Sequence, residues 1–328
     1  MNETVKELEI DKRNLNFIST EDAVKEYQSS KNPLIYSNSE NSINWVLDNL
    51  SEYDISKYIK FFKDKAAFRE AIKDFYPDFY FKKGTINEFK TLSPDNIKLP
   101  LVLKPPVGFL SLGVHIIEDI EDWYMTILSI DKEISRISSL YPAHVLNSTD
   151  FIIEELIKGE EYAVDAYYNS EGKPVILNIF HHKFLHNRDV RDRIYITSQD
   201  IITKYKEPFS EFLEKLGQKQ NIKNFPVHVE MRVRADGQII PIEVNPMRFA
   251  GWCTTDTAYY AWGINIYEYF FYQQEPDWEK IFAQRASDAK YYFAMAEVPP
   301  SVDTSKMREF DYHDFSSSNF SNILELRK

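Results

Sequence analysis

Two stretches of alternating polar and apolar residues, 228–234 and 239–245, constrain the fold most strongly. Asp236 and Gly237 lie between them, and this dipeptide is typical of a tight turn between antiparallel strands. We therefore predict a hairpin in a half-buried sheet. Because side chains alternate between the two faces of a strand, one face of the hairpin carries polar groups: Glu230, Arg232 and Arg234 on the first strand, Glu243 and Asn245 on the second.

The polar face of this hairpin predicts a magnesium site. Glu230, Glu243 and Asn245 provide three oxygen ligands on adjacent strands, and Mg²⁺ leaves its other positions to water and nucleotide phosphates. The alternative is that these are ordinary solvent-facing residues. His228 shares the face of Glu230, where it would orient a substrate, act as a base, or pack there for structural reasons. Arg232 and Arg234 are also compatible with ordinary salt bridges.

A second motif is the segment 101–114, LVLKPPVGFLSLGV, in a chain with only 9 glycines. An apolar strand ends at Lys104 and leads into a turn that contains Gly108, Ser111 and Gly113. Backbone N–H groups of such a turn approach phosphate oxygens closely, and the lysine adds positive charge. The segment therefore indicates a polyphosphate site, with a solvated lysine beside a Pro-Pro turn as the alternative.

A third motif is the segment 151–165, FIIEELIKGEEYAVD, where a buried strand runs into paired acidic residues around a glycine. Carboxylates repel phosphate, but they accept hydrogen bonds from an adenine amino group and from ribose hydroxyls. The alternative is a surface hairpin with solvated glutamates.

Taken together, the three motifs resemble the ATP-grasp superfamily over a region from about Asp64 to Gly251. The resemblance implies an α/β (α+β) chain with the ATP-grasp fold, in which two lobes clasp ATP behind a short N-terminal α/β lobe. It also implies roles for individual residues. Lys104, Ser111, Gly113 and Lys65 would contact the phosphates; Glu154 would contact the adenine amino group; Glu155 and Ile157 would offer backbone groups to the purine; Glu161 would hold the ribose; Glu230, Glu243 and Asn245 would bind the metal.

Within the superfamily, the HVE and EVNPMRFAG segments resemble the bacterial L-amino acid ligases and related carboxylate-amine ligases. That branch implies that Arg248 binds the acyl phosphate or the substrate carboxylate. It implies ATP and Mg²⁺ as cofactors, with Mn²⁺ as a substitute, and small-molecule carboxylate and amine substrates such as amino acids. An ATP-grasp kinase and a non-catalytic nucleotide-binding subunit remain alternatives. The short N-terminal lobe and the Pro246-Met247 insertion depart from the branch and leave the substrate open.

A basic segment, HHKFLHNRDVRDR, stands out in a chain of net charge -12. We predict a substrate loop there, with Lys183 as a catalytic candidate, against the alternative of a solvated turn. Adjacent histidines on a strand face opposite sides, so one metal ion would not readily bind both His181 and His182. The other basic residues of this segment are His186, Arg188, Arg191 and Arg193.

The rest of the sequence sets the broader expectations. We divide the chain into an N-terminal lobe (1–60), a small lobe (61–150), a large lobe with an antiparallel sheet (151–275) and a C-terminal extension (276–328). The N-terminal lobe is expected to contain strands at NFIS and PLIYS, and the segment 255–274 to form one aromatic core helix. The single cysteine, the lack of an N-terminal apolar stretch and the acidic charge favour a cytoplasmic protein that binds neither nucleic acid nor a membrane; a homodimer stays open.

Overall fold

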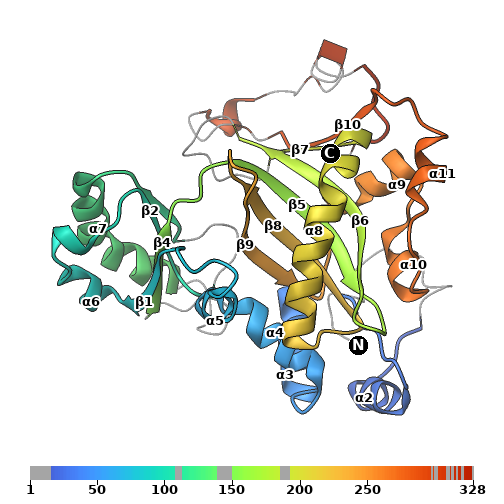
Figure 1. The fold of residues 1–328 in the computed structure, drawn as a ribbon, viewed down its shortest axis with the longest axis horizontal. Helices are drawn as coiled ribbons and strands as arrows, with labels where there is room; N and C mark the ends of the chain where they lie inside the picture. The colour runs from blue at the N-terminus through green and yellow to red at the C-terminus, as the bar shows by residue number, and fades with distance from the viewer. Residues whose placement is uncertain are drawn as a thin grey trace.

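Two antiparallel sheets dominate the structure, a computed structural model that describes residues 16–107, 113–138, 150–184, 193–296 and short stretches between 298 and 326. A four-stranded sheet and its helices form a small lobe at one end of the molecule (Figure 1), and a six-stranded sheet forms the centre of a larger lobe. This arrangement of mixed helices and antiparallel sheets agrees with the predicted α+β class.

The small lobe contains strands in the order β1-β4-β2-β3, each antiparallel to its neighbours. Leu101 and Leu103 of the predicted phosphate-site strand are fully buried, and Trp123 packs beneath them with Phe89 in the same apolar cluster. The two-residue alternation of the strand thus points one face inward and leaves the other toward the cavity, which Val102 and Lys104 line. The elements are β1 (Phe81–Thr85), α6 (Ile86–Lys90), β2 (Leu101–Lys104), β3 (His115–Ile117), α7 (Ile120–Ser138) and β4 (Asp150–Glu155).

The large lobe is built on a sheet of order β10-β7-β6-β5-β8-β9, in which every pair is antiparallel. The turn predicted at Asp236-Gly237 is present, because Gly237 (φ 86°) connects β8 to β9, and Gly172 (φ 88°) connects β5 to β6 in a similar turn. The hairpin predicted from the alternating segments is therefore confirmed. The strands are β5 (Glu160–Tyr168), β6 (Pro174–Lys183), β7 (Ile194–Ser198), β8 (Phe225–Val233), β9 (Ile239–Pro246) and β10 (Lys290–Ala294).

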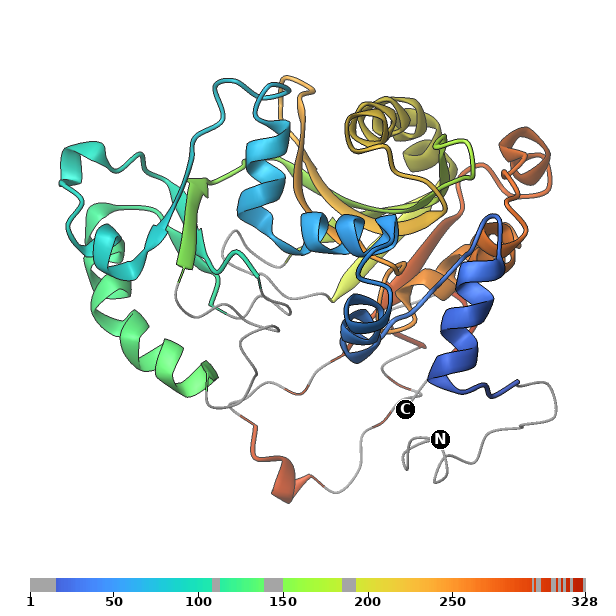
Figure 2. The same cartoon turned by 90° about the horizontal axis from the view of Figure 1, so that it is seen from below.

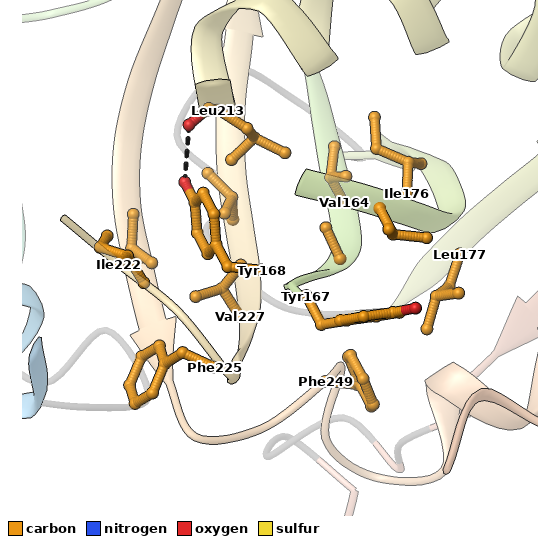
Figure 3. Packing of buried hydrophobic residues seen from close by; sticks show 14 of the residues in the cluster. Val164, Tyr167, Tyr168, Ile176, Leu177, Leu213, Ile222, Phe225, Val227 and Phe249 are labelled. Carbon is orange, nitrogen blue, oxygen red and sulfur yellow. Dashed lines mark hydrogen bonds between the residues drawn. The ribbon is translucent and has the colours of Figure 1, made fainter. Parts of the chain in front are cut away.

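Helix α8 (Gln199–Gln220) covers one face of this sheet (Figures 1 and 2). Tyr168 of β5 reaches it, since its hydroxyl donates to the Leu213 carbonyl at 2.9 Å within the apolar cluster drawn in Figure 3. Gly217 permits this approach, because a Cβ there would lie 2.4 Å from the Tyr168 ring. Residues that alternate with this set, such as Glu161 and Asp165, consequently face the opposite side, where the candidate site lies.

The N-terminal part differs from the prediction, because residues 16–60 contain helices but none of the expected strands within the described positions. The segment PLIYS is extended, but it packs its apolar side chains on the core of the large lobe instead of joining a ladder. An extended segment with apolar residues resembles a strand in sequence even when its backbone has no strand to pair with. The helices are α2 (Thr20–Ser29), α3 (Glu40–Asn49), α4 (Asp54–Lys63) and α5 (Lys65–Ile72).

The predicted aromatic helix at 255–274 is also wrong, because the chain forms two short helices there. Gly263 ends the first with a left-handed conformation (φ 73°), and the Asn265 side chain caps the second. None of the described helices is long and apolar enough to cross a membrane. The elements are η3 (Thr254–Asp256), α9 (Thr257–Trp262), α10 (Ile266–Phe271) and α11 (Trp278–Phe282); η2 (Pro94–Asn96) and η4 (Thr304–Lys306) are single 3₁₀ turns.

Candidate active site

A cavity of about 560 Å³ lies between the two sheets, on the face of the large sheet opposite α8. The two lobes supply its walls: Lys104 and Ile116 come from the small sheet, and Glu161 from the large one. Eleven of the predicted site residues line this single cavity, although they span 184 positions of sequence: Lys65, Lys104, Glu154, Glu155, Ile157, Glu161, His228, Glu230, Glu243, Asn245 and Arg248.

Two lysines provide positive charge on one side of the cavity. Lys65 is the first residue of α5, whose N-terminus is capped by the Asp64 carboxylate. The Lys65 backbone N–H donates to the Pro106 carbonyl at 2.9 Å, which joins the start of the helix to the loop after β2. Lys104 ends β2 with only 5% of its side chain exposed. The start of α5 and the end of β2 thus direct two cations into the same part of the cavity.

The carboxylate of Glu154 forms ion pairs with two cations. Arg69, one helical turn after Lys65, donates to both Glu154 oxygens at 2.7 and 3.2 Å, and the Lys104 ammonium lies 2.6 Å from Oε1. Burial tends to raise the pKa of Glu154, but the charges of Arg69 and Lys104 outweigh it and lower this pKa to about 2. Glu154 is therefore ionised, and its strongest contacts hold the phosphate-side lysine in place.

Burial affects the two lysines differently. Desolvation lowers the pKa of Lys104 despite the nearby Glu154 carboxylate, and the cations Arg69 and Lys65 lower it further. For Lys65, desolvation also acts to lower the pKa, but Glu243, whose Oε2 lies 2.8 Å from the ammonium, raises it overall. Two close cations in one pocket repel each other and are stabilised by anions. A polyanion such as a triphosphate would relieve that repulsion.

The link between β4 and β5 forms the floor of the cavity. Gly159 has φ 141°, and a Cβ at this position would lie 2.2 Å from the Val233 carbonyl oxygen, so only glycine fits. Nearby, Arg232 donates to the Ile157 carbonyl at 2.6 Å and to Glu161 Oε2 at 2.9 Å. The second Glu161 oxygen lies 2.9 Å from His182 Nδ1. Glu161 is thus held rigidly at the edge of the cavity with both oxygens oriented.

Glu155 contributes to the same region in a different way. Its backbone N–H donates to the Tyr80 carbonyl at 2.9 Å, and its side chain forms an ion pair with Arg234. That N–H is consequently committed within the protein, which leaves the Glu155 carbonyl as the backbone group for a ligand. Arg234 therefore has a structural partner, in line with the salt-bridge alternative.

The predicted metal ligands lie together on β8 and β9. Glu230 pairs directly with Glu243, and a bulge just after Glu230 turns both Ile242 and Glu243 toward the cavity. The Asn245 amide nitrogen lies 3.4 Å from Glu230 Oε1 and 3.2 Å from Glu243 Oε1. The amide nitrogen of Asn245 faces the two carboxylates in this structure, and its Oδ1 accepts from Arg248. With the amide oxygen turned toward the carboxylates, the three side chains would form an oxygen donor set of the kind that Mg²⁺ prefers.

Charge around these carboxylates agrees with a cation site. Burial tends to raise the pKa of Glu243, but Lys65 and Lys104 lower it to about 2, so the group is an anion. Within the described part of the chain, this site included, no three His, Cys, Asp or Glu side chains are grouped to hold a metal ion. The candidate therefore depends on Asn245 as its third ligand.

The loop after β9 carries Arg248 and is anchored by a buried aspartate. Arg248 donates to Asn245 Oδ1 at 2.8 Å, next to the metal ligands. Asp165, fully buried on β5, accepts from the Ala250 N–H at 2.8 Å and from the Thr255 hydroxyl at 2.7 Å. It also contacts His228 Nδ1 at 2.8 Å, which leaves His228 Nε2 directed toward Glu230 at 3.8 Å. One carboxylate therefore orients both the histidine and the loop.

Three of the predicted site residues are not among the residues that line the cavity. Lys183 is directed away from the cavity, because it and His181 both bind Glu160 on the face opposite to His182. Its proposed catalytic role therefore has no support in the geometry. Gly113 has φ 73°, as a turn glycine should, but lies outside the cavity lining. Ser111, like Gly108, His186, Arg188 and Arg191, lies outside the described residues.

Sequence reasoning missed Arg69, Asp165 and Asn38. Arg69 occupies the same face of α5 as Lys65, four residues earlier, and this spacing was the one available signal. Asp165 lies within the ATP-site motif but appeared to be a plain strand residue. Asn38 belongs to the N-terminal segment, far from every motif, yet it lines the cavity.

Comparison with known proteins agrees with this architecture. A family model described as the ATP-grasp domain matches residues 97–256. The chain has no significant match among curated protein sequences. Among solved structures, an L-amino acid ligase from Bacillus licheniformis has a TM-score of 0.53 at 19% identity, covering 65% of this chain and 49% of its own.

A biotin carboxylase from Campylobacter jejuni has a TM-score of 0.54 at 14% identity, covering 72% of this chain and 52% of its own. The chain thus spans about half the length of these two proteins. At such identities the likeness concerns the fold alone. The family match and the shared architecture together identify residues 97–256 as an ATP-grasp domain, and the fold of the chain as the ATP-grasp fold.

Proposed function

We propose that the chain is an ATP-dependent ligase that joins a carboxylate to an amine. An oxygen of the substrate carboxylate attacks the γ-phosphorus of ATP, the bond to ADP breaks, and an acyl phosphate forms. The amine nitrogen then attacks the acyl carbon, phosphate leaves, and the nitrogen loses a proton. The products are an amide, ADP and phosphate. Positioning and charge neutralisation carry most of the catalysis in such phosphoryl transfer.

The observation that supports this proposal most directly is the cavity's arrangement of charge. Lys65 and Lys104 lie on one side, the oxygen donors on β8 and β9 are next to them, and Arg248 follows immediately through its bond to Asn245. A triphosphate along the lysines would place its last phosphate near Arg248, whose planar guanidinium suits a carboxylate or an acyl phosphate. A site for nucleotide alone does not need this additional cation.

The adenosine end would occupy the other side of the cavity. Glu161 would accept hydrogen bonds from ribose hydroxyls, and the Ile157 N–H with the Glu155 carbonyl would contact the purine edge. Glu154 is held by Arg69 and Lys104, so its main task would be to position Lys104. Glu230, Glu243 and Asn245 would hold Mg²⁺, which when bound neutralises phosphate charge.

Amino acids are the first substrates to test, because a structural neighbour is an L-amino acid ligase. The experiment measures ADP and phosphate formation from MgATP over a matrix of carboxylates and amines. A ligase needs both substrates for full turnover and yields an amide that mass spectrometry detects. ADP formation with a hydroxyl acceptor and without an amine would instead indicate a kinase. If ATP bound with no ADP formed in any combination, the chain would be a binding subunit.

The metal ligands provide the first test by mutation. Glu243→Gln or Asn245→Ala should abolish turnover without unfolding the chain, because each removes an oxygen ligand from the same small space. Turnover is measured at low millimolar magnesium, and circular dichroism checks the fold. Glu171→Gln, in the exposed turn between β5 and β6, serves as the control. Near-normal ADP production by either site variant would show that the metal assignment is wrong.

A further inference from the structure

The N-terminal segment 36–38 lies directly along the loop that carries Arg248. The Ser37 N–H donates to the Met247 carbonyl at 3.0 Å, and the Phe249 N–H donates to the Tyr36 hydroxyl at 3.4 Å. The Tyr36 ring also packs on Phe249, with centroids 5.3 Å apart. Both neighbours of Arg248 are thus bonded to this segment, and the next residue along it, Asn38, lines the same cavity as Arg248.

Asn38 has a free donor in this position. It lines the cavity, and its Oδ1 accepts a hydrogen bond from the Tyr36 hydroxyl at 2.6 Å. Burial and the neighbouring Tyr267 raise the pKa of Tyr36, so its hydroxyl stays protonated and keeps this donor role. The Asn38 amide also interacts with the Tyr267 hydroxyl. Since an amide nitrogen carries two hydrogens, one remains for a ligand in the cavity.

We infer that Asn38 is a specificity-determining residue that donates a hydrogen bond to the substrate carboxylate beside Arg248. This inference rests on the proposed function and deepens it. It assigns Asn38 as the second hydrogen-bond donor, after Arg248, of an anion site that binds the substrate carboxylate. The residue lies outside the segment 97–256 that matches the ATP-grasp domain. The N-terminal segment is thus part of the substrate site, and residues 97–256 alone would lack one of the two donors to the substrate carboxylate.

The charge distribution explains why a neutral donor suits this place. In the proposed site Arg248 would neutralise the charge of the substrate carboxylate, and Lys65 and Lys104 would contact the phosphates. The carboxylate must still act as a nucleophile, and a second full cation on it would lower its nucleophilicity. An amide N–H orients an oxygen without withdrawing its charge to the same extent. Substrates that carry a carboxylate at this end should bind better than their amides.

The test compares Asn38→Ala and Asn38→Asp with Asn87→Asp, which makes the same charge change at an exposed position of α6. With a carboxylate found active in the substrate matrix, we expect the KM for this carboxylate to rise about 10- to 100-fold in Asn38→Ala, the range for one hydrogen bond to a charged group. Asn38→Asp should be worse, because two carboxylates then repel. The KM for ATP and the Asn87→Asp control should stay unchanged.

Tyr36→Phe adds a second variant that keeps the aromatic packing but removes the hydrogen bond to Asn38 Oδ1 and the longer one that the Phe249 N–H donates to the same hydroxyl. It should raise the carboxylate KM in the same direction, with a smaller effect than Asn38→Ala. A merely structural role of the segment would instead change ATP binding and thermal stability along with it. An equal rise of both KM values, or no rise of the carboxylate KM in Asn38→Asp, would overturn the inference.

Direct binding separates this inference from the ligase proposal. Ligand-observed NMR measures the binding of the proteinogenic L-amino acids and of their carboxamides to the chain saturated with MgADP. Binding of a carboxylate that weakens in Asn38→Asp supports the anion site even if no ADP is ever formed, a result that would reject the ligase alone. If no carboxylate bound the wild-type chain, or if the carboxamides bound equally well, the anion site itself would be refuted.

Discussion

Arg248 is the residue that best distinguishes binding of the substrate carboxylate from binding of the nucleotide. It donates to Asn245 Oδ1 at 2.8 Å and to the Phe249 carbonyl at 3.1 Å, so its guanidinium plane is fixed at the end of the cavity. A guanidinium forms two parallel hydrogen bonds to a carboxylate or phosphate, and a lysine ammonium has no such geometry. The substitution that keeps the charge is therefore the informative one.

Arg248→Lys should lower kcat and kcat/KM together by about 100-fold, because the lost bonds strengthen as the acyl phosphate forms. The affinity for ATP should change little, since Lys65 and Lys104 are the residues proposed to hold the phosphates. Steady-state ligation and calorimetry with MgATP measure the two effects separately. A large loss of ATP affinity with normal turnover would assign Arg248 to the nucleotide and would remove the main support for a ligase over a kinase.

At the scale of elements, α5 connects three parts of the site through one buried side chain. Arg69 is 2% exposed and binds Glu154 of β4, and its third bond, at 2.6 Å, goes to the Pro241 carbonyl of β9. Its guanidinium also lies over the Phe79 ring, 4.5 Å from the centroid. The helix that carries Lys65 is thereby joined to both sheets. Arg69 should therefore matter for stability as well as for the position of the lysines.

Arg69→Met should destabilise the chain by about 3–5 kcal/mol, because it leaves the buried Glu154 with Lys104 as its remaining cation. Urea unfolding measures the loss. Lys73→Met, at the end of the same helix in an exposed ion pair with Glu70, should cost less than about 1 kcal/mol. The double variant Arg69→Met/Glu154→Gln should be more stable than the sum of the single losses predicts. Strict additivity would mean that the two side chains do not support each other.

For the molecule as a whole, the buried carboxylates predict how stability depends on acid. The pKa of Glu154 is about 2 in the folded chain, below its ordinary value of 4.5. A carboxyl group whose pKa is lower in the folded chain than in the unfolded chain stabilises the fold fully above about pH 4.5. This contribution is lost as the pH falls toward 2. The shift corresponds to about 3 kcal/mol.

Urea unfolding across this acid range should show the free energy of unfolding falling most steeply between pH 4.5 and 2. In Glu154→Gln the fall should be shallower, because one of the two buried carboxylates that take up a proton in this range, Glu154 and Glu243, is gone. Glu171→Gln, in the exposed turn between β5 and β6, is a comparison that should keep the wild-type slope. Equal slopes for the wild type and Glu154→Gln would show that the Glu154 cluster does not govern acid unfolding.

The sequence by itself determined the local features. Alternation over 228–245 predicted both strands and their polar face, and Asp236-Gly237 marked the turn between them, where Gly237 has a positive φ. Motif order was enough to assign the ATP-grasp fold and eleven of the residues that line the cavity. These features depend on residues close together in the chain, where periodicity and turn chemistry act directly.

Only the tertiary structure decided which distant groups meet. The segment 33–37 has the composition of a strand, but it forms no strand in the described structure and instead bonds to the loop that carries Arg248, with Asn38 in the cavity lining. Lys183 looked catalytic by charge, yet one step of strand alternation directs it to Glu160. Asp165 gains its importance from Thr255, 90 positions away. Local pattern carries no information on such contacts, because their energy comes from burial and pairing that exist only once the lobes are assembled.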